Sequence, residues 1–397
     1  MPDNALDDVV VLDLTRVVSG PYATQLLADL GARVIKVESP GSGDETRLLG
    51  PRVGSESAMF LGLNRGKESI VVDLRSAGGR GVIQDLVRRA DVVIENFRPG
   101  VATRLGLNYP ALKDLNPRVV ACSISGYGQD GPGAGRPAYD VIVQALGGGM
   151  SLTGEPDRPP VRMGLPVADL AGGLFAIIGI LTALHERART GQGQYVDIAL
   201  LDCHVSLLSY FASYYLLAGD VTRAVGSGHP SAEPYGAFPT ADGYVVIAVY
   251  NESFWPKLCE ALGQPELATD PRFALNRERV RNRRELRARL RTIMERQTTD
   301  HWVAALAAVG VPAGPINSID RTLADPQVRY RNMIVEVAHS LCGTLRLPGN
   351  PVKLSRHGGA RSLPPPVLGE HGERILRDFL SYSPERVAAL RRDGSVG

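Results

Sequence analysis

From Val9 to Gly128 the sequence alternates between short hydrophobic segments and longer amphipathic ones, and this alternation limits the possible folds most strongly. "VVVLDL" (9–14) is typical of a strand, "PYATQLLADLG" of a helix and "RVIKVE" (33–38) of a second strand. Pro21 takes the first helical position and Gly31 follows the helix end, as capping preferences predict. The pattern repeats through "SIVVDL", "GGRGVIQDLVRRA", "DVVIEN" and "RVVACSISGYG". It predicts an α/β fold with a parallel sheet covered by helices on both faces.

In the second half of the chain the sequence pattern changes at about Gly226, where a loop-like segment begins. A helix is expected from Asp169 to Arg189, closed by Gly191, and then a strand and one long apolar helix in "YVDIALLDCHVSLLSYFASYYLL". Residues 225–325 look like a second, smaller α/β domain. It contains a basic helical stretch, Arg272–Arg296, interpreted as a solvated amphipathic helix. Its predicted buried stripe is Val280, Leu286, Leu290 and Ile293.

Composition argues against several classes of partner. With 44 basic and 42 acidic residues the net charge is +2, which provides no overall field to attract nucleic acid or an anionic membrane. The longest uncharged stretch, 170–184, is short for a bilayer and is expected to be a buried helix. The start, "MPDNALDD", lacks the features of a secretory signal. The scattered cysteines Cys122, Cys203, Cys259 and Cys342 form no CxxC pair, so we expect a soluble protein of the reducing cytoplasm.

Several common catalytic motifs are missing from the sequence. The first strand–helix turn, "TRVVSGPYA", has only Gly20 in place of GxGxxG, and Val17 and Val18 would obstruct a pyrophosphate. A nicotinamide site is therefore a remote alternative, although Glu38 stands where a ribose-binding acid is expected. The chain has no Walker A sequence and no GxSxG elbow, and its seven histidines form no ligand cluster, so we expect no metal.

One carboxylate stands out. Asp169 lies in "GLPVADLAGG", an uncharged and largely apolar stretch, and an ionised Asp is seldom buried without a partner. It precedes a predicted helix, so it is either an N-cap or a functional group, and spacing leaves both open. The glycine-dense stretch from Ser125 to Asp140 is likewise either a surface loop or a backbone that closely approaches a ligand.

Several blocks of the sequence resemble the family III CoA-transferases. The matching blocks, in order, are "VLDLTRVVSGPYATQLLADLGARVIKVESPGSGDETR", "NRGKESIVVDL", "ADVVIENFRPG", "RLGL", "SISGYGQDGP", "YDVIVQA", "VADLAGG", "TGQGQYVDIALLD", "GVPAGPINS" and "VLGEH". The resemblance covers nearly the whole chain. It implies a large Rossmann-like CoA-binding domain from residues 1–220 and 330–397, the small domain at 225–325, and an interlocked homodimer.

The resemblance also implies roles for individual residues. Asp169 matches the family's nucleophile, which attacks an acyl-CoA and passes through an aspartyl anhydride and an aspartyl-CoA thioester. Ser39 replaces a basic residue of formyl-CoA transferases, so its phosphate contact is absent or supplied elsewhere, for example by Arg16. Arg75, Arg98, Arg104 and Arg136 are the chemically reasonable phosphate partners. The matched CoA-contacting positions are Val17, Val18, Val72, Asp73, Leu74, Arg75, Asn96, Phe97, Arg98, Arg104, Arg136, Pro137, Ala138 and Tyr139.

Within this fold the α-methylacyl-CoA racemases are the main alternative. They carry His before the Asp that matches Asp140, whereas this chain has Tyr139, so the usual second base is missing. The loop "GSGHPSAEPYGAF" looks most like transferases that use succinyl-CoA and a dicarboxylic acid. His229 or Arg223 is a candidate for binding a second carboxylate, and Tyr139 and Asp140 are further substrate candidates.

Two physical expectations follow for the nucleophile. The carboxylate of Asp169 has to be ionised to attack, and we expect the helix start and small neighbours to keep it charged in a site that excludes water. The backbone of Gly126–Gly135 is a candidate donor to the developing oxyanion.

Overall fold

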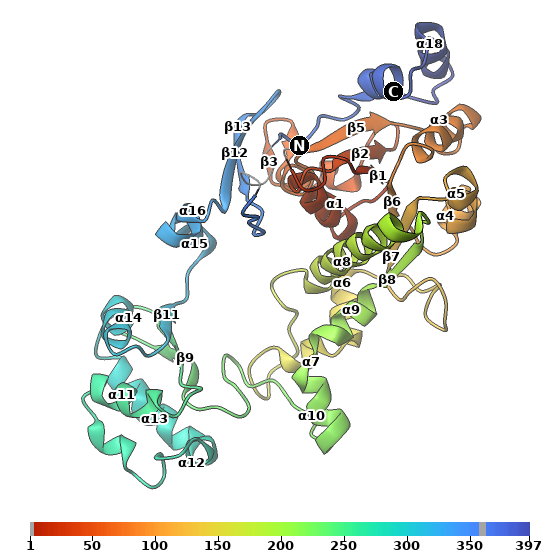
Figure 1. Cartoon of the computed structure of the whole chain (residues 1–397). Coiled ribbons are helices and arrows are strands. Elements are labelled where there is room, and N and C mark those ends of the chain that lie inside the picture. Colours follow the sequence, from red (N-terminus) through yellow and green to blue (C-terminus); the bar gives the residue numbers. More distant parts are fainter. Residues whose placement is uncertain (1–3, 357–362) are drawn as a thin grey trace. The chain divides into compact units, whose positions relative to one another are not determined.

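The computed structural model describes residues 4–356 and 363–397 (Figure 1). Residues 357–362, within the predicted C-terminal part of the large domain, lie outside the described residues. The chain forms two compact units. The first comprises Met1–Gly147, Gly164–Leu207 and Pro326–Gly397, and the second comprises Gly148–Met163 and Leu208–Asp325.

A six-stranded parallel sheet forms the centre of the first unit, as the alternating sequence predicts. The chain order reverses between β1 and β6, so these two neighbouring strands form the switch point at which such sheets bind ligands. Across the sheet the strands are β5 (Lys67–Val71), β2 (Arg33–Glu38), β1 (Val10–Asp13), β6 (Val92–Glu95), β7 (Val120–Ser125) and β8 (Tyr195–Ala199).

Helices cover both faces of this sheet, which confirms the two-sided packing expected for a parallel sheet. Successive residues of a strand point to opposite faces, and in β1 Val11 packs with α1 (Ser19–Asp29) and α8 (Val167–Thr190). Leu12 packs on the other side with α3 (Ala77–Val87), α5 (Tyr109–Leu115) and α18 (Pro384–Arg392).

Helix α8 carries Asp169 and has 24 residues, more than the predicted helix. By length and composition it could cross a membrane, yet it packs against α1, α9 (Leu200–Leu207), β7 and β8. Gly179 sits where a Cβ would come within 2.6 Å of Val196 in β8. Gly191, with a φ of +73°, follows its last residue as predicted. One face of α8 therefore belongs to the core, whereas Leu174 and Ile178 on another face are exposed, so the helix is only partly buried as predicted.

Shorter elements complete the first unit. They are η1 (Glu45–Leu48), β3 (Arg52–Val53), β4 (Glu56–Ser57), α2 (Ala58–Leu63), α4 (Val101–Arg104), α6 (Asp140–Leu146), α16 (Pro326–Tyr330), β12 (Ile334–His339), β13 (Gly343–Pro348), α17 (Gly372–Arg374) and η3 (Ile375–Phe379).

The second unit is built around a three-stranded antiparallel sheet with its own apolar core, which includes Phe238 and Trp255. Its elements are α7 (Gly149–Leu152), α10 (Tyr210–Ala218), β9 (Tyr235–Pro239), β10 (Tyr244–Ala248), α11 (Phe254–Ala261), η2 (Pro265–Ala268), α12 (Asn276–Arg281), α13 (Arg283–Met294), α14 (Thr299–Ala308), β11 (Ala313–Pro315) and α15 (Ile319–Ala324).

Two helix predictions need correction. The long apolar helix expected after Tyr195 is divided into α9 and α10, with Ser209 in the left-handed region at a φ of +50°. The basic stretch is divided at Asn282 into α12 and α13. Within the predicted buried stripe, Leu286 and Leu290 are buried, whereas Val280 and Ile293 are only half-buried.

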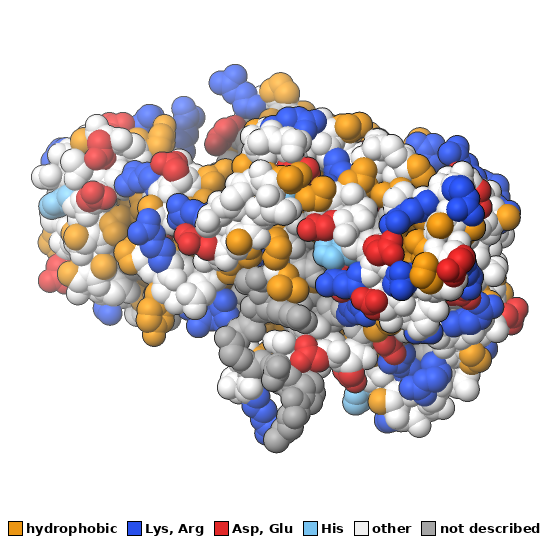
Figure 2. Space-filling view, turned by 90° about the horizontal axis from the view of Figure 1, so that it is seen from above, with side chains coloured by type: hydrophobic (Ala, Val, Ile, Leu, Met, Phe, Trp, Pro, Cys, Tyr) orange, Lys and Arg blue, Asp and Glu red, His pale blue; other side chains and the backbone are white. Residues whose placement is uncertain are grey.

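Charged side chains of both signs are mixed on the surface. On the face shown in Figure 2, Lys and Arg side chains are interspersed with Asp and Glu, and hydrophobic side chains lie between them. This distribution matches the near-balance of charges in the sequence.

Candidate active site

Asp169 lies in the first turn of α8 and is half-buried. The N-cap of this helix is Pro166, so the interpretation of Asp169 as the N-cap is wrong. The cap is supplied by another helix, since Asp140 Oδ1 accepts hydrogen bonds from the backbone N–H groups of Ala168 (2.8 Å) and Asp169 (3.4 Å). The start of α8 is therefore fixed by the first residue of α6.

Asp140 is itself held in place. Gln144, one turn later in α6 and fully buried, donates from Nε2 to Asp140 Oδ2 at 2.6 Å and to the backbone oxygen of Leu165 at 3.2 Å. Both carboxylate oxygens of Asp140 thus accept hydrogen bonds from within the first unit.

The electrostatic surroundings of Asp169 are the reverse of what we expected. Burial, followed by the negative charge of Asp140, raises the pKa of Asp169 from 3.8 to about 7. Among the described residues no cation forms an ion pair with Asp169, and the favourable end of the helix is occupied by Asp140. Near neutral pH the Asp169 carboxyl is therefore divided between its protonated and ionised forms, and its ionised form is poorly stabilised.

The two glycines of the "ADLAGG" block place this carboxylate. A Cβ at Gly173 would lie 2.7 Å from the backbone oxygen of Ser19, the first residue of α1. A Cβ at Gly172 would lie 2.3 Å from Leu200 of α9. One turn after Asp169, α8 thus comes into close contact with the start of α1, directly beyond the loop that leaves β1.

A cavity of about 380 Å³ lies at the carboxyl ends of β1, β2, β5 and β6, where the strand order reverses. Arg75, a predicted phosphate partner, lines it. So do Ser39, which replaces a basic residue of formyl-CoA transferases, and Arg16, the candidate to supply the missing phosphate contact. The lining residues that were predicted from the sequence are Arg16, Ser39, Val72, Asp73, Leu74, Arg75 and Phe97.

The other predicted CoA positions have different surroundings. Val17 and Val18 directly follow Arg16, which lines the cavity. The side-chain amide of Asn96 forms two hydrogen bonds with the backbone of Arg16. Arg98, just before α4, and Arg104, the last residue of α4, are both exposed. Arg136, Pro137, Ala138 and Tyr139 belong to the glycine-dense loop before α6, where Tyr139 is exposed and Arg136 lies 5.2 Å from the ring centroid of Tyr127.

Two backbone N–H groups of the glycine-dense loop are already hydrogen-bonded to side chains of the protein. The N–H of Gly128 donates to Ser125 Oγ (3.1 Å) and that of Gln129 to Asp197 Oδ2 (3.1 Å). Gly126 is required for packing, because a Cβ there would lie 2.3 Å from Ala138. The amides of Gly128 and Gln129 are therefore poor candidates for an oxyanion donor in this conformation.

Glu38 has a structural role that argues against a nicotinamide site. It is buried and bound by Arg47 through two hydrogen bonds of 2.7 Å, and by the hydroxyl of Ser69 at 2.7 Å. The Arg47 contact lowers the pKa of Glu38 despite its burial. Its oxygens are engaged, so it is not free to bind a ribose.

His229 lies in the second unit, in a group of aromatic rings formed by Tyr210, Tyr235 and Tyr250. Its Nδ1 accepts a hydrogen bond from the backbone N–H of Ser231 (3.1 Å), so the neutral ring carries its proton on Nε2. Burial and then the nearby Arg283 lower the pKa of His229, which favours this neutral form.

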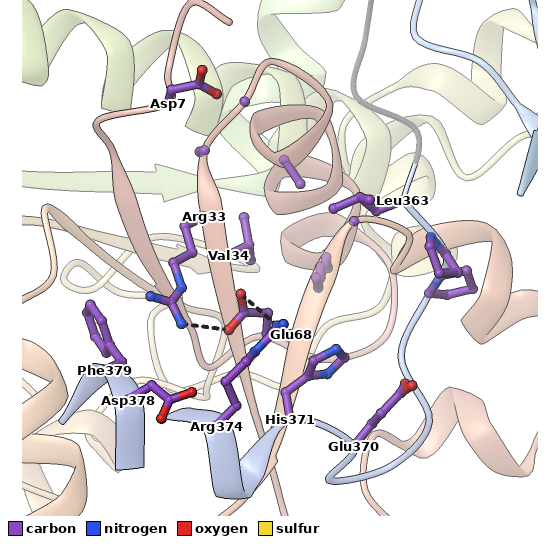
Figure 3. Close-up of a pocket in the computed structure, with 17 residues that line it drawn as sticks. Asp7, Arg33, Val34, Glu68, Leu363, Glu370, His371, Arg374, Asp378 and Phe379 are labelled. Atoms are coloured by element: carbon purple, nitrogen blue, oxygen red, sulfur yellow. Dashed lines mark hydrogen bonds and ion pairs between the residues drawn. The ribbon is translucent and has the colours of Figure 1, made fainter. Parts of the chain in front are cut away.

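A second and larger cavity, of about 740 Å³, opens at the amino ends of β2 and β5 (Figure 3). Arg33 and Arg374 both bind Glu68, at 2.9 and 3.1 Å, and Arg33 lies beside Phe379. This cavity contains none of the predicted site residues. Open α/β sheets bind ligands at the carboxyl ends of their strands, so we place the candidate site at the smaller cavity.

Comparison with known proteins identifies the family of this chain. The family model described as CoA-transferase family III matches residues 6–372. The chain is a family III CoA-transferase. It is 42% identical over 95% of its length to acetyl-CoA:oxalate CoA-transferase of Acetobacter aceti, covering 96% of that protein. It is 40% identical over 98% of its length to human succinyl-CoA:glutarate CoA-transferase, covering 90% of that protein.

A solved structure shares the fold of this transferase. The crystal structure of a CAIB/BAIF family protein from Brucella suis matches with a TM-score of 0.86 and 42% identity, covering 96% of this chain and 99% of that one. The mixed α/β architecture and the enzyme class expected from the sequence are thus confirmed.

The sequence analysis of this transferase missed two buried residues at the site. Lys36 and Asp44 form an ion pair of 2.9 Å beneath the β1–α1 loop, and their side chains are fully buried. Lys36 could have been found by the argument used for Asp169, because it is a charged residue in the middle of the apolar strand "RVIKVE". Asp44, in the loop after that strand, gave no such indication.

Proposed function

We propose that this transferase moves CoA from succinyl-CoA to a free dicarboxylic acid, with Asp169 as the covalent carrier. Family membership supports the enzyme class, and the position of Asp169 supports its role. Asp169 is a half-buried carboxylate with no cationic partner among the described residues, held at the start of a tightly packed helix. That single observation carries the assignment of the nucleophile.

The proposed reaction requires no external oxidant, reductant or metal. The Asp169 carboxylate attacks the thioester carbonyl, which gives a mixed anhydride and CoA thiolate. The thiolate attacks the aspartyl carbonyl, so the donor acid leaves and an aspartyl-CoA thioester remains. The acceptor carboxylate attacks this thioester to give a second anhydride and thiolate. The thiolate then takes the acceptor acyl group, and the carboxylate is regenerated.

The raised pKa of Asp169 fits this role. A carboxylate that is poorly stabilised by its surroundings is a better nucleophile, and acylation removes its charge from a partly buried site. The attack consumes the ionised form, so the reaction draws on the fraction that is ionised near neutral pH. Restricted access of water protects the anhydride from hydrolysis.

The smaller cavity, at the point between β1 and β6 where the strand order reverses, is called the switch-point cavity, and we propose that it binds the nucleotide end of CoA. Arg16 and Arg75 line it and would bind phosphate oxygens, and Arg16 would supply the charge that Ser39 lacks. Both arginines have acidic neighbours in the free protein, at 3.4 Å from Glu45 and 3.1 Å from Asp73, so phosphate would compete with these exposed pairs.

The choice of a dicarboxylic acceptor follows from the named activities of the relatives. Oxalate and glutarate, acceptors named for the two relatives above, both have two carboxylates. His229, the candidate named from the sequence, offers a neutral Nε2–H donor rather than a cation. The lengths of these two acids differ, so identity to the relatives does not select one.

The decisive experiment incubates the purified protein with succinyl-CoA and a panel of mono- and dicarboxylic acids. We expect ping-pong kinetics and hydroxylamine-sensitive label on Asp169, and Asp169→Ala should abolish exchange while retaining CoA binding. Exchange by Asp169→Ala would overturn the assignment. Exchange of the C2 hydrogen in D₂O without an acceptor would indicate a racemase instead.

We further propose that the protein works as a cytoplasmic homodimer, as the family resemblance implies.

A further inference from the structure

The loop between β1 and α1 is held by side chains from other parts of the first unit. Asn96, at the end of β6, accepts a hydrogen bond from the N–H of Arg16 at 2.9 Å and donates to its carbonyl oxygen at 2.7 Å. Lys36 of β2 donates from Nζ to the carbonyl oxygen of Thr15 at 2.9 Å. Side chains of two neighbouring strands thus bind the backbone of Thr15 and Arg16.

The next residue of the loop is strained. Val17 has a φ of +70°, a conformation that a β-branched residue adopts only when its surroundings impose it. Asp44 Oδ1 lies 3.4 Å from the N–H of Val17, at the long end of hydrogen-bond range, and its other oxygen pairs with Lys36 at 2.9 Å. One buried ion pair thus contacts the backbone on both sides of Arg16, directly before the strained residue.

In the free protein these two side chains expose no surface to a ligand. Lys36 and Asp44 both belong to the lining of the switch-point cavity, but their side chains are fully buried and paired with each other. Burial acts to lower the pKa of Lys36, but the negative charges of Asp13, Asp44 and Glu38 outweigh it and raise the pKa, which favours the charged form. In this structure their polar atoms bind the loop backbone and each other, and Asp44 also accepts two hydrogen bonds from Thr46.

We infer that Lys36, Asp44 and Asn96, which we call the loop clamp, are positioning residues that fix the β1–α1 loop in the shape that receives acyl-CoA. The inference rests on the proposed function. The loop lies at the switch point, its strained residue follows a cavity-lining arginine, and its far end meets Gly173 of the helix that carries Asp169. A clamp here would align the CoA site with the nucleophile.

The test measures acyl-CoA binding in Asp44→Asn and Lys36→Met. Each variant removes one charge of the buried pair and keeps a side chain of similar size. We expect KM for the acyl-CoA and Kd for CoA to rise about tenfold or more, with kcat changed much less, because the loop would no longer be preorganised. Unchanged KM and Kd in folded variants would overturn the clamp.

A single variant leaves one buried charge unpaired, which can prevent folding. The double variant Lys36→Met/Asp44→Leu removes both charges and is the second measurement. It is expected to fold and to show the same rise in KM and Kd. A folded double variant with wild-type KM and Kd would contradict the inference.

The matched control is Asp29→Asn. Asp29 forms an equally buried pair with Arg65 at the far end of α1 and lines neither the loop nor its cavity. This variant should lose thermal stability without a change in KM, which separates loss of positioning from loss of stability. If the wild-type protein transfers CoA and the clamp variants bind normally, only the clamp fails. If the wild type transfers no CoA, the proposed function fails first.

Discussion

At the scale of single residues, Asp169 shows a conflict between stability and function. Its pKa of about 7 in the folded protein is far above 3.8, so the folded state holds a proton that the unfolded chain releases. The stability associated with this group is therefore full below about pH 4 and is lost as the pH rises toward 7. Near neutral pH this half-buried carboxyl therefore lowers the stability of the folded protein.

Replacing this carboxyl should stabilise the protein while abolishing its activity. Asp169→Asn is expected to raise the free energy of unfolding at pH 8 by about 1–4 kcal/mol, from the size of the pKa shift reduced for partial exposure. The gain should shrink toward zero near pH 4. Urea unfolding at both pH values measures it, with exposed Asp114→Asn as control. Equal stability of wild type and Asp169→Asn at pH 8 would contradict the raised pKa.

The same pKa predicts the pH dependence of catalysis. We expect kcat/KM for the acyl-CoA to rise with pH through an apparent pKa near 7, because only ionised Asp169 attacks. Asp140→Asn keeps an oxygen for the N–H of Ala168 but removes the negative charge, so the rising limb should move to lower pH. A limb that stays in place would mean that Asp140 does not influence the nucleophile.

The sequence identified Asp169 but not its state of ionisation. A charged residue in an apolar stretch is visible in any single sequence, whereas the charge that raises its pKa comes from Asp140, 29 residues earlier. The same limit hid the partners of Asn96, which was predicted to contact CoA and is bound to the backbone of Arg16. Pairings between distant segments require the fold.

At the scale of secondary structure, close packing of helix α8 positions the nucleophile. Glycines at 172, 173 and 179 let it approach α9, α1 and β8, closer than any side chain would allow. Most strands of the large sheet and the Gly191 helix end were predicted correctly because hydrophobic periodicity and capping are local. However, β5 covers Lys67–Val71 rather than residues 69–74, and α1 begins at Ser19, two residues before Pro21. The breaks at Ser209 and Asn282 were not predicted, because neither residue interrupts the helical pattern.

A methyl group at Gly173 should disturb both stability and catalysis. Because a Cβ would lie 2.7 Å from the backbone oxygen of Ser19, α8 or α1 has to move. We expect Gly173→Ala to cost about 1–3 kcal/mol of stability and to lower kcat/KM about tenfold or more. Thermal denaturation and steady-state kinetics measure the two effects.

Gly81→Ala is the matched control. Gly81 lies inside α3 with nothing within 4 Å of a built Cβ, so alanine should stabilise the helix by up to about 1 kcal/mol and leave kinetics unchanged. If Gly173→Ala behaved like Gly81→Ala, close packing at the start of α1 would not position Asp169.

At the scale of the whole molecule, the strand order is that of dinucleotide-binding folds, yet the loop at the switch point lacks their glycines. In place of a glycine turn the chain has a strained valine supported by buried charges. This difference explains why the fold class could be predicted from periodicity, whereas the ligand could be named only from the resemblance to a family. Fold and ligand chemistry are specified by different residues.

The proposed interlocked homodimer makes a prediction that an ordinary dimer does not. Exposed apolar side chains on α10, among them Leu216 (76% exposed) and Leu217 (87% exposed), are the kind of surface that a second chain covers. Light scattering should give about 85 kDa, twice the 42.5 kDa of one chain, and the value should persist on dilution. Threaded chains cannot separate without unfolding. When tagged dimers and untagged dimers are combined under native conditions, they should therefore not exchange subunits. Refolding them together should produce mixed dimers, whereas rapid native exchange or a 42.5 kDa mass would exclude threading.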